Sequence, residues 1–116
     1  YNLDGAEPSE AIIANWWRQG MAGGALAHHA TVASWLEDYT EDLKKITVPV
    51  LVMHGEADQV VPFASSVPRA VNLLKNGSLK TYPGFPHGMP TTHADQINAD
   101  ILDFVSGLRA AAAPAA

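Results

Sequence analysis

An unbroken apolar run in the middle of the chain constrains its fold most strongly. The run Val48–Met53 is β-branched or aliphatic at every position except Pro49, and His54-Gly55 follows it. Such a run is typical of a strand covered on both faces, and Pro49 fits near its start, where no ladder donor is missed. Strands covered on both faces occur in parallel sheets flanked by helices, so the run predicts an α/β fold.

A helix and a second strand are predicted directly after this run. Residues 63–76 carry apolar side chains at helical spacing, with Pro68 acceptable in the first turn and Asn76-Gly77 as a stop signal. Residues 78–82 then follow as a short strand. Strand, helix and strand in sequence predict a right-handed parallel crossover in a doubly wound sheet.

Further helices are predicted on either side of this unit. Ser9 is placed to cap a helix that ends at Gly23-Gly24, a second helix begins near Ala25, and Thr40 opens a short helical turn. Residues 94–108 form a last helix with one apolar stripe, and the alanine-rich residues 109–116 are expected to fray.

Composition excludes several classes of protein. The net charge is −5 with seven scattered Lys and Arg, which argues against nucleic acid as a partner. Without cysteine there is no disulfide and no thiolate zinc site. The apolar runs are too short to span a membrane and the first ten residues carry no secretory signal, so we expect a cytoplasmic protein with no membrane partner.

The predicted sheet is too small to stand alone. The length of 116 residues allows one domain, and a start at Tyr1 rather than Met indicates a truncated or excised sequence. Two parallel strands leave edges and faces uncovered. We therefore expect either another polypeptide to supply the missing strands or two copies to pair their edges.

Two polar residues follow the two predicted strands. Asp58 comes after the first strand and His87 after the second. Sites in open α/β sheets form at the carboxyl ends of strands, so the two side chains are expected to touch. A carboxylate on one ring nitrogen of histidine fixes its tautomer and leaves the other nitrogen to take a proton from a nucleophile.

The motifs around these two residues resemble one family. Residues 47–55, TVPVLVMHG, followed by DQVVP at 58–62 and GFPHGM at 84–89, are similar to the cofactor-free haloperoxidase and arylesterase branch of the α/β-hydrolases. Residues 16–21, WWRQGM, resemble its helical cap more weakly. The resemblance implies a cap remnant over 1–45, the C-terminal part of the hydrolase core over 46–108 and a tail over 109–116.

The resemblance implies that Asp58 is the acid and His87 the general base of a Ser-Asp-His triad. It also implies hydrolysis of small esters and formation of peracids from carboxylic acids and peroxide, with no metal, haem or other cofactor. The G-x-S-x-G turn that presents the serine does not occur, and the six serines lie in other contexts. An N-terminal hydrolase fragment would have to supply the serine and the oxyanion hole. The alternative is a self-associating, non-catalytic module with relic triad residues.

The other histidines have simpler interpretations. His54 is expected to pack rather than react, and His93 to start a helix. The adjacent His28 and His29 point to different helix faces, which disfavours a metal site.

Two pairs of residues keep alternative interpretations. Trp16 and Trp17 either line an acyl pocket or pack the cap. Ser65 or Ser66, near Asp58 in sequence, would serve as nucleophile only in a repurposed chain.

Overall fold

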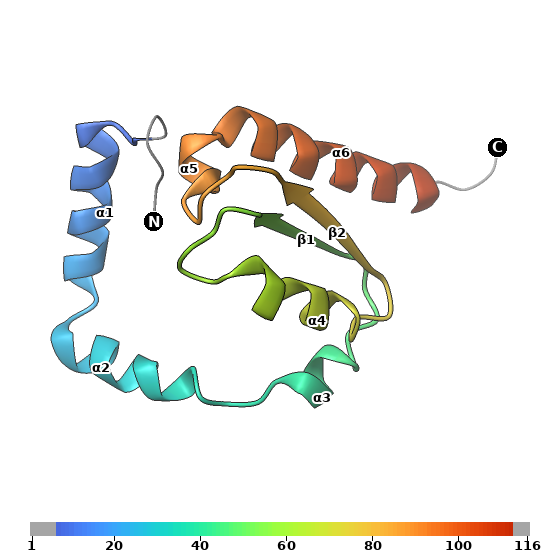
Figure 1. The fold of residues 1–116 in the computed structure, drawn as a ribbon, viewed down its shortest axis with the longest axis horizontal. Coiled ribbons are helices and arrows are strands. Elements are labelled where there is room, and N and C mark those ends of the chain that lie inside the picture. Colours follow the sequence, from blue (N-terminus) through green and yellow to red (C-terminus); the bar gives the residue numbers. More distant parts are fainter. Residues whose placement is uncertain (1–6, 113–116) are drawn as a thin grey trace.

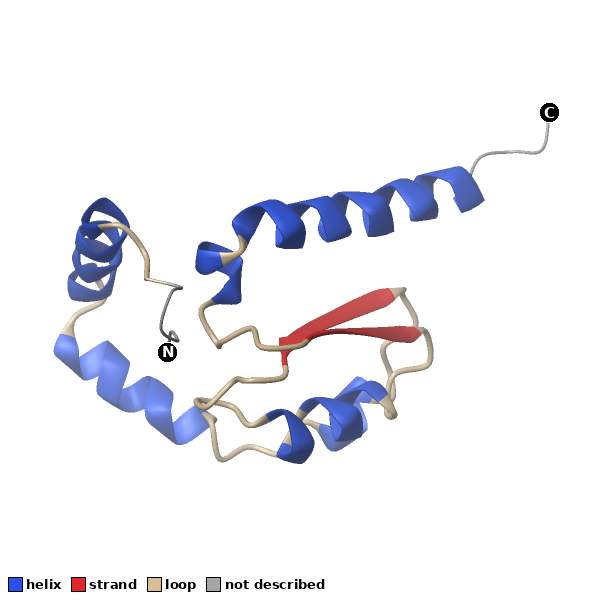
Figure 2. Cartoon of the chain, turned by 45° about the horizontal axis from the view of Figure 1, so that its top comes forward, coloured by secondary structure: helices blue, strands red, loops and turns tan. Residues whose placement is uncertain are grey.

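A computed structural model describes residues 7–112, which form a small α/β unit preceded by three helices (Figure 1). The α/β unit contains the strands β1 (Val50–Gly55) and β2 (Gly77–Tyr82). The remaining elements are the helices α1 (Glu10–Ala22), α2 (Ala25–Ser34), α3 (Thr40–Leu43), η1 (Phe63–Ser65), α4 (Val67–Val71), α5 (Met89–Thr92) and α6 (Ala94–Ala112). Figures 1 and 2 show α6 on one side of the two strands and α4 on the other.

The two strands pair in parallel, as the sequence predicts. Val50 lies opposite Gly77 and Gly55 opposite Tyr82, so both strands end at the same level. Pairing begins at Val50, whose N–H donates to Asn76 O, rather than at Val48, because Pro49 has no N–H to contribute. The expectation of a strand covered on both faces is not met within this chain, since residues 50–54 are only half-buried.

The helix expected over residues 63–76 is shorter and broken. Ser66, with φ −122° and ψ −82°, separates η1 from α4, and its hydroxyl donates to Pro62 O. A residue directly before a proline disfavours helical backbone angles, and Pro68 itself has no N–H to donate, so a helix does not run unbroken into Pro68. Regular helix then ends at Val71, followed by tighter turns in which Leu74 N donates to Val71 O.

The C-terminal helix is longer than expected. α6 continues from residue 108 to Ala112 because alanine, which occupies 110–112, has the highest helix propensity. Residues 109–112 are thus helical, the fraying expected of the alanine-rich tail stays a prediction, and residues 113–116 lie outside the described part. The single turn α5 was not predicted from the sequence.

A small core joins α6 to the strands. Tyr82, Met89 and Ile97 are buried together, with Met53 and Phe85 packed against them. The Tyr82 hydroxyl also donates to Asp100 Oδ2 at 2.6 Å, and Lys80 pairs with Asp100 Oδ1 at 2.6 Å. These contacts dock α6 on the strand that leads to His87.

The three N-terminal helices form where the sequence places them but bury none of their residues. The Ser9 side chain accepts a hydrogen bond from Ile12 N, as expected of a cap, and Gly24 with φ 71° separates α1 from α2. Leu26 and Leu36 are each 89% exposed. The radius of gyration is 17.1 Å, against about 13 Å for a compact domain of this length. Residues 1–6 of the expected cap lie outside the described part.

Candidate active site

Two backbone hydrogen bonds tie the loop after β1 to the loop after β2. Glu56 N donates to Tyr82 O at 3.0 Å, and Ala57 N donates to Phe85 O at 3.2 Å. These bonds continue the parallel pairing past the strand ends. They bring Asp58 and His87 to the same edge of the sheet, as the strand order predicts.

Gly55 permits this close approach of the loops. A Cβ at Gly55 would lie 2.2 Å from the carbonyl oxygen of Phe85 and 3.1 Å from that of Pro86. No side chain fits at such distances, so the position requires glycine. The His54-Gly55 sequence after the apolar run is thus a structural condition for the contact between Asp58 and His87.

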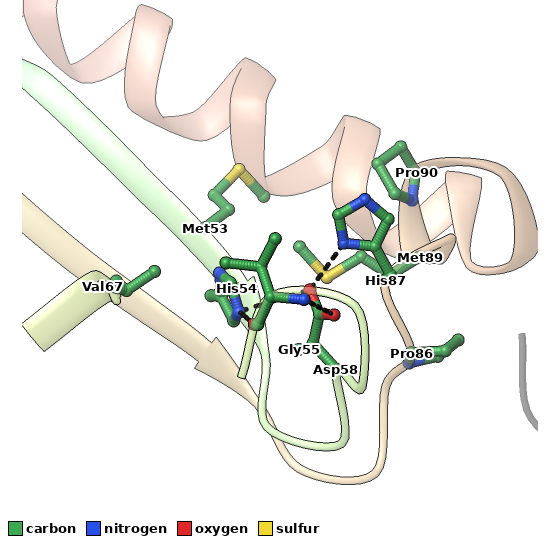
Figure 3. Close-up of a pocket in the computed structure, with 10 residues that line it drawn as sticks. Met53, His54, Gly55, Asp58, Val67, Pro86, His87, Met89 and Pro90 are labelled. Carbon is green, nitrogen blue, oxygen red and sulfur yellow. Dashed lines mark hydrogen bonds and ion pairs between the residues drawn. The ribbon is translucent and has the colours of Figure 1, made fainter. Parts of the chain in front are cut away.

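The Asp58 carboxylate is buried and hydrogen-bonded at both oxygens (Figure 3). Oδ1 accepts from Val60 N and Val61 N, each at 2.8 Å, and Oδ2 lies 2.7 Å from His87 Nδ1. Burial raises the pKa of Asp58, but the hydrogen bonds from Val61, His87 and Val60 outweigh it and hold the pKa below its ordinary value. Asp58 is therefore a carboxylate at neutral pH.

His87 is held between the second strand and α5. Gly84, with φ 76°, turns the chain after β2, and Phe85 N donates to Tyr82 O within this turn. The side chain of His87 is 35% exposed, whereas that of Asp58 is 4% exposed. The ring thus has one nitrogen on a buried carboxylate while part of the ring reaches the surface, which is the geometry of a general base in a carboxylate-oriented pair.

A second imidazole approaches the same carboxylate. His54 Nε2 lies 3.3 Å from Asp58 Oδ2 and 3.0 Å from Val61 O, and its ring packs against Phe63. Packing was expected of His54, but its contact with Asp58 was not foreseen. No sequence pattern marks this contact, because a spacing of four residues brings side chains together within a helix and not across the end of a strand.

The pair opens onto a cavity of about 450 Å³. Figure 3 shows His54, Asp58 and His87 among its lining residues. Most of its other lining is apolar, from Met53, Val61, Val67, Pro86, Met89 and Pro90. A volume of this size with an apolar wall and a few polar groups suits a small organic molecule.

The remaining candidates lie elsewhere. Ser65 and Ser66 do not line this cavity, and both hydroxyls donate to Pro62 O. Trp16 and Trp17 do not line it either. His93 directly precedes α6 and stacks on Phe85, with ring centroids 3.7 Å apart.

Residues 7–112 offer neither a metal-ligand cluster nor a membrane-crossing helix. No group of three or more His, Asp or Glu side chains there is placed to hold a metal ion. No helix in that part of the chain has both the length and the apolar character needed to cross a bilayer.

Comparison with known proteins identifies the family of the chain. Residues 19–92 match the family described as serine aminopeptidase, S33. The chain is 57% identical over 106 residues to a bifunctional esterase/perhydrolase of Acinetobacter calcoaceticus and 55% identical to a non-heme chloroperoxidase of Burkholderia pyrrocinia. Both matches cover 90% of this chain and 38% of the relative.

A solved structure gives the same result. The bromoperoxidase of Bacillus anthracis superposes with a TM-score of 0.57 at 34% identity, over 60% of this chain and 25% of that protein. The chain therefore belongs to the α/β-hydrolases, in the branch of the non-heme haloperoxidases, and represents a C-terminal portion of that fold. It spans less than two fifths of the length of the curated relatives named above.

Proposed function

We propose that this chain supplies the acid and the base of a Ser-Asp-His triad in an esterase or perhydrolase. Asp58 is the acid and His87 the general base. The observation that carries the proposal is the 2.7 Å contact between His87 Nδ1 and the buried, ionised Asp58 carboxylate, both of which line a largely apolar cavity. The names of the two relatives above, an esterase/perhydrolase and a chloroperoxidase, support the reaction class.

In this proposal the carboxylate fixes the His87 tautomer with the proton on Nδ1. Nε2 is then the nitrogen that takes the proton from a serine hydroxyl as the hydroxyl attacks the ester carbonyl. Asp58 stabilises the imidazolium that forms, and His87 returns the proton to the leaving alcohol. In the perhydrolase reaction hydrogen peroxide replaces water as the acceptor of the acyl group.

The serine and the oxyanion hole are not encoded in these 116 residues, since no G-x-S-x-G occurs. We propose that they belong to the part of the fold that the relatives carry outside the matched region. In subtilisin, another enzyme with a Ser-His-Asp triad, loss of the nucleophile alone lowers turnover by about 10⁶-fold. The chain by itself is accordingly expected to hydrolyse no ester.

The test is a joined protein in which this chain replaces the segment of the Acinetobacter relative that it matches, so that the relative supplies the part that precedes that segment. We expect the joined protein to hydrolyse p-nitrophenyl acetate and the 116-residue chain not to. Asp58→Asn or His87→Gln should lower kcat by at least about 10³-fold. Glu56→Gln, an exposed carboxylate two residues from Asp58, is the matched control. Turnover by the joined protein that survives both substitutions would refute the assignment.

Self-association is the second candidate, and the exposed apolar side chains favour it. Leu26, Trp35 and Leu36 are 75–89% exposed, and β1 and β2 are each paired on one edge only within the described chain. A second copy could cover these surfaces. Light scattering, combined with an esterase assay after adding the N-terminal part of the Acinetobacter relative, distinguishes the two candidates. A stable dimer of this chain that gains no esterase activity supports the self-associating module. A complex of the two parts with esterase activity supports the hydrolase.

A further inference from the structure

His54 has a defined relation to the proposed acid that packing alone does not require. Its side chain is 12% exposed, and its Nε2 lies 3.0 Å from Val61 O, with which it makes a hydrogen bond, and 3.3 Å from Asp58 Oδ2. Figure 3 shows His54 and Asp58 in the same site. The histidine lies on β1, whereas both oxygens lie in the loop that follows. One side chain thus connects the strand to the turn that carries the carboxylate.

The two neighbours determine where the His54 proton lies. A backbone carbonyl oxygen only accepts hydrogen bonds, and an ionised carboxylate also only accepts. Because both neighbours of Nε2 only accept, Nε2 must carry a proton, which it donates to Val61 O at 3.0 Å. Asp58 Oδ2, at 3.3 Å, lies beside this N–H and makes an electrostatic contact with it. The His54 ring is therefore a donor toward the site and not a base in it.

Val61 closes a ring of contacts around the carboxylate. Its N–H donates to Asp58 Oδ1 at 2.8 Å, and its C=O accepts from His54 Nε2. The residue is held from both sides, so the orientation of the turn depends on His54 as well as on Asp58. Oδ2 then lies between two imidazoles and faces His87 Nδ1 at the shorter distance of 2.7 Å.

We propose that His54 is a positioning residue for the Asp58–His87 pair, which holds the turn and the carboxylate oriented toward His87 through its Nε2–H. The expected change in kcat rests on the proposed function. The expected proton position on the His54 ring does not. His54 acts through Asp58 and contacts no reacting atom.

Two substitutions separate the donor from the volume of the ring. His54→Phe keeps an aromatic ring against Phe63 and removes the N–H. His54→Gln places an amide N–H close to where Nε2 lies in the histidine. In the joined protein we expect His54→Phe to lower kcat for p-nitrophenyl acetate by about 10-fold to about 100-fold with little change in KM, because misorientation affects the chemical step. His54→Gln should restore most of kcat.

His29→Phe is the matched control, because His29 lies on the exposed helix α2. It should leave kcat unchanged. Equal losses from His54→Phe and His54→Gln would overturn the proposal, since shape rather than donation would then matter. Unchanged kcat in both would overturn it as well.

A measurement on the unsubstituted chain is independent of activity. Long-range ¹H–¹⁵N correlation spectra of the histidine rings report which nitrogen carries the proton. We expect protonated Nε2 in His54 and protonated Nδ1 in His87. A His54 ring with its only proton on Nδ1 would overturn the proposal even if the joined protein is active. A joined protein without turnover would refute the proposed function but leave this spectroscopic test of His54 in force.

Discussion

Ala57 donates its backbone N–H to the carbonyl oxygen of Phe85 at 3.2 Å, one residue before Asp58 and two residues before His87. The bond joins two loops that are distant in sequence, directly before the residues that carry the candidate site. It exists because Gly55 has no side chain between the two loops. The placement of Asp58 and His87, the proposed acid and base, therefore depends on backbone contacts as much as on the side chains themselves.

Gly55→Ala is expected to separate the two loops. The new Cβ would meet backbone atoms at 2.2 Å and 2.7 Å, which cannot move aside as a flexible side chain would. We expect a loss of about 1 to 3 kcal/mol in the free energy of unfolding, measured by urea titration, and a longer distance between Asp58 and His87.

Gly107→Ala is the control for this substitution. Gly107 lies inside α6, and a Cβ added there would meet nothing within 4 Å outside its own helix backbone. Replacing a helical glycine by alanine should stabilise the chain by about 0.5 to 1 kcal/mol. Equal effects of the two substitutions would contradict the steric role of Gly55.

The pKa of Asp58 predicts how stability depends on pH. Hydrogen bonds hold its pKa in the folded chain below the ordinary value of 3.8, against the opposing effect of burial. A carboxyl with a lowered folded pKa stabilises the fold above its unfolded pKa, and that stabilisation is lost as the pH falls through the folded value. The free energy of unfolding should therefore decline below about pH 4.

Asp58→Asn removes this titration. Its urea-unfolding curves should change less between about pH 6 and about pH 2 than those of the unsubstituted chain. Glu56→Gln changes an exposed side chain of the same loop and should leave the difference in place. Parallel pH dependences for the unsubstituted chain and Asp58→Asn would show that the carboxylate makes no net favourable contacts in the fold.

Tyr82 provides a test of how α6 is attached. Tyr82 is 2% exposed, and its hydroxyl donates to Asp100 at 2.6 Å. Burial raises the pKa of Tyr82 most, the contact with Asp100 raises it further, and the hydroxyl therefore stays protonated. Tyr82→Phe should cost about 1 kcal/mol in the free energy of unfolding. Tyr39→Phe should have no measurable effect, because the Tyr39 hydroxyl makes an exposed contact at 3.5 Å. If both substitutions lower the free energy of unfolding by a similar amount, the hydrogen bond from Tyr82 to Asp100 is not what stabilises the attachment of α6.

The sequence predicted the parallel strands and the contact of Asp58 with His87 because these features depend on local patterns. A β-branched run, a stop at Asn76-Gly77 and polar residues after each strand determine a parallel crossover with its loops on one edge. The catalytic role of the pair stays a prediction, since a contact does not measure a reaction.

Other features depend on conformations that spacing does not encode. The break at Ser66 arises from one non-helical residue next to Val67-Pro68, and the extension of α6 arises from helix propensity without an apolar stripe. The exposure of α1 and α2 was not predicted either. Helical spacing identifies the apolar face of a helix but does not say what covers it.

The buried core is small, so each of its members carries a large share of the stability. Val67, Tyr82, Met89 and Ile97 are buried core residues of the described chain, and Pro86 is fully buried as well. Ile97 is 4% exposed and packs on Tyr82 and Met89, next to the loop of His87. Ile97→Ala should therefore cost about 2 to 4 kcal/mol in the free energy of unfolding, measured by urea titration.

Ile101→Ala, one turn further along the same helix, is the matched control, because Ile101 is 42% exposed. It should cost well under half as much, since the truncated side chain leaves no cavity. If the two substitutions lower the free energy of unfolding equally, a partner surface covers Ile101 in solution and holds α6. The packing of Ile97 is then not what positions the loop of His87. A larger cost at Ile97 means that the α6 contacts on β2 hold that loop.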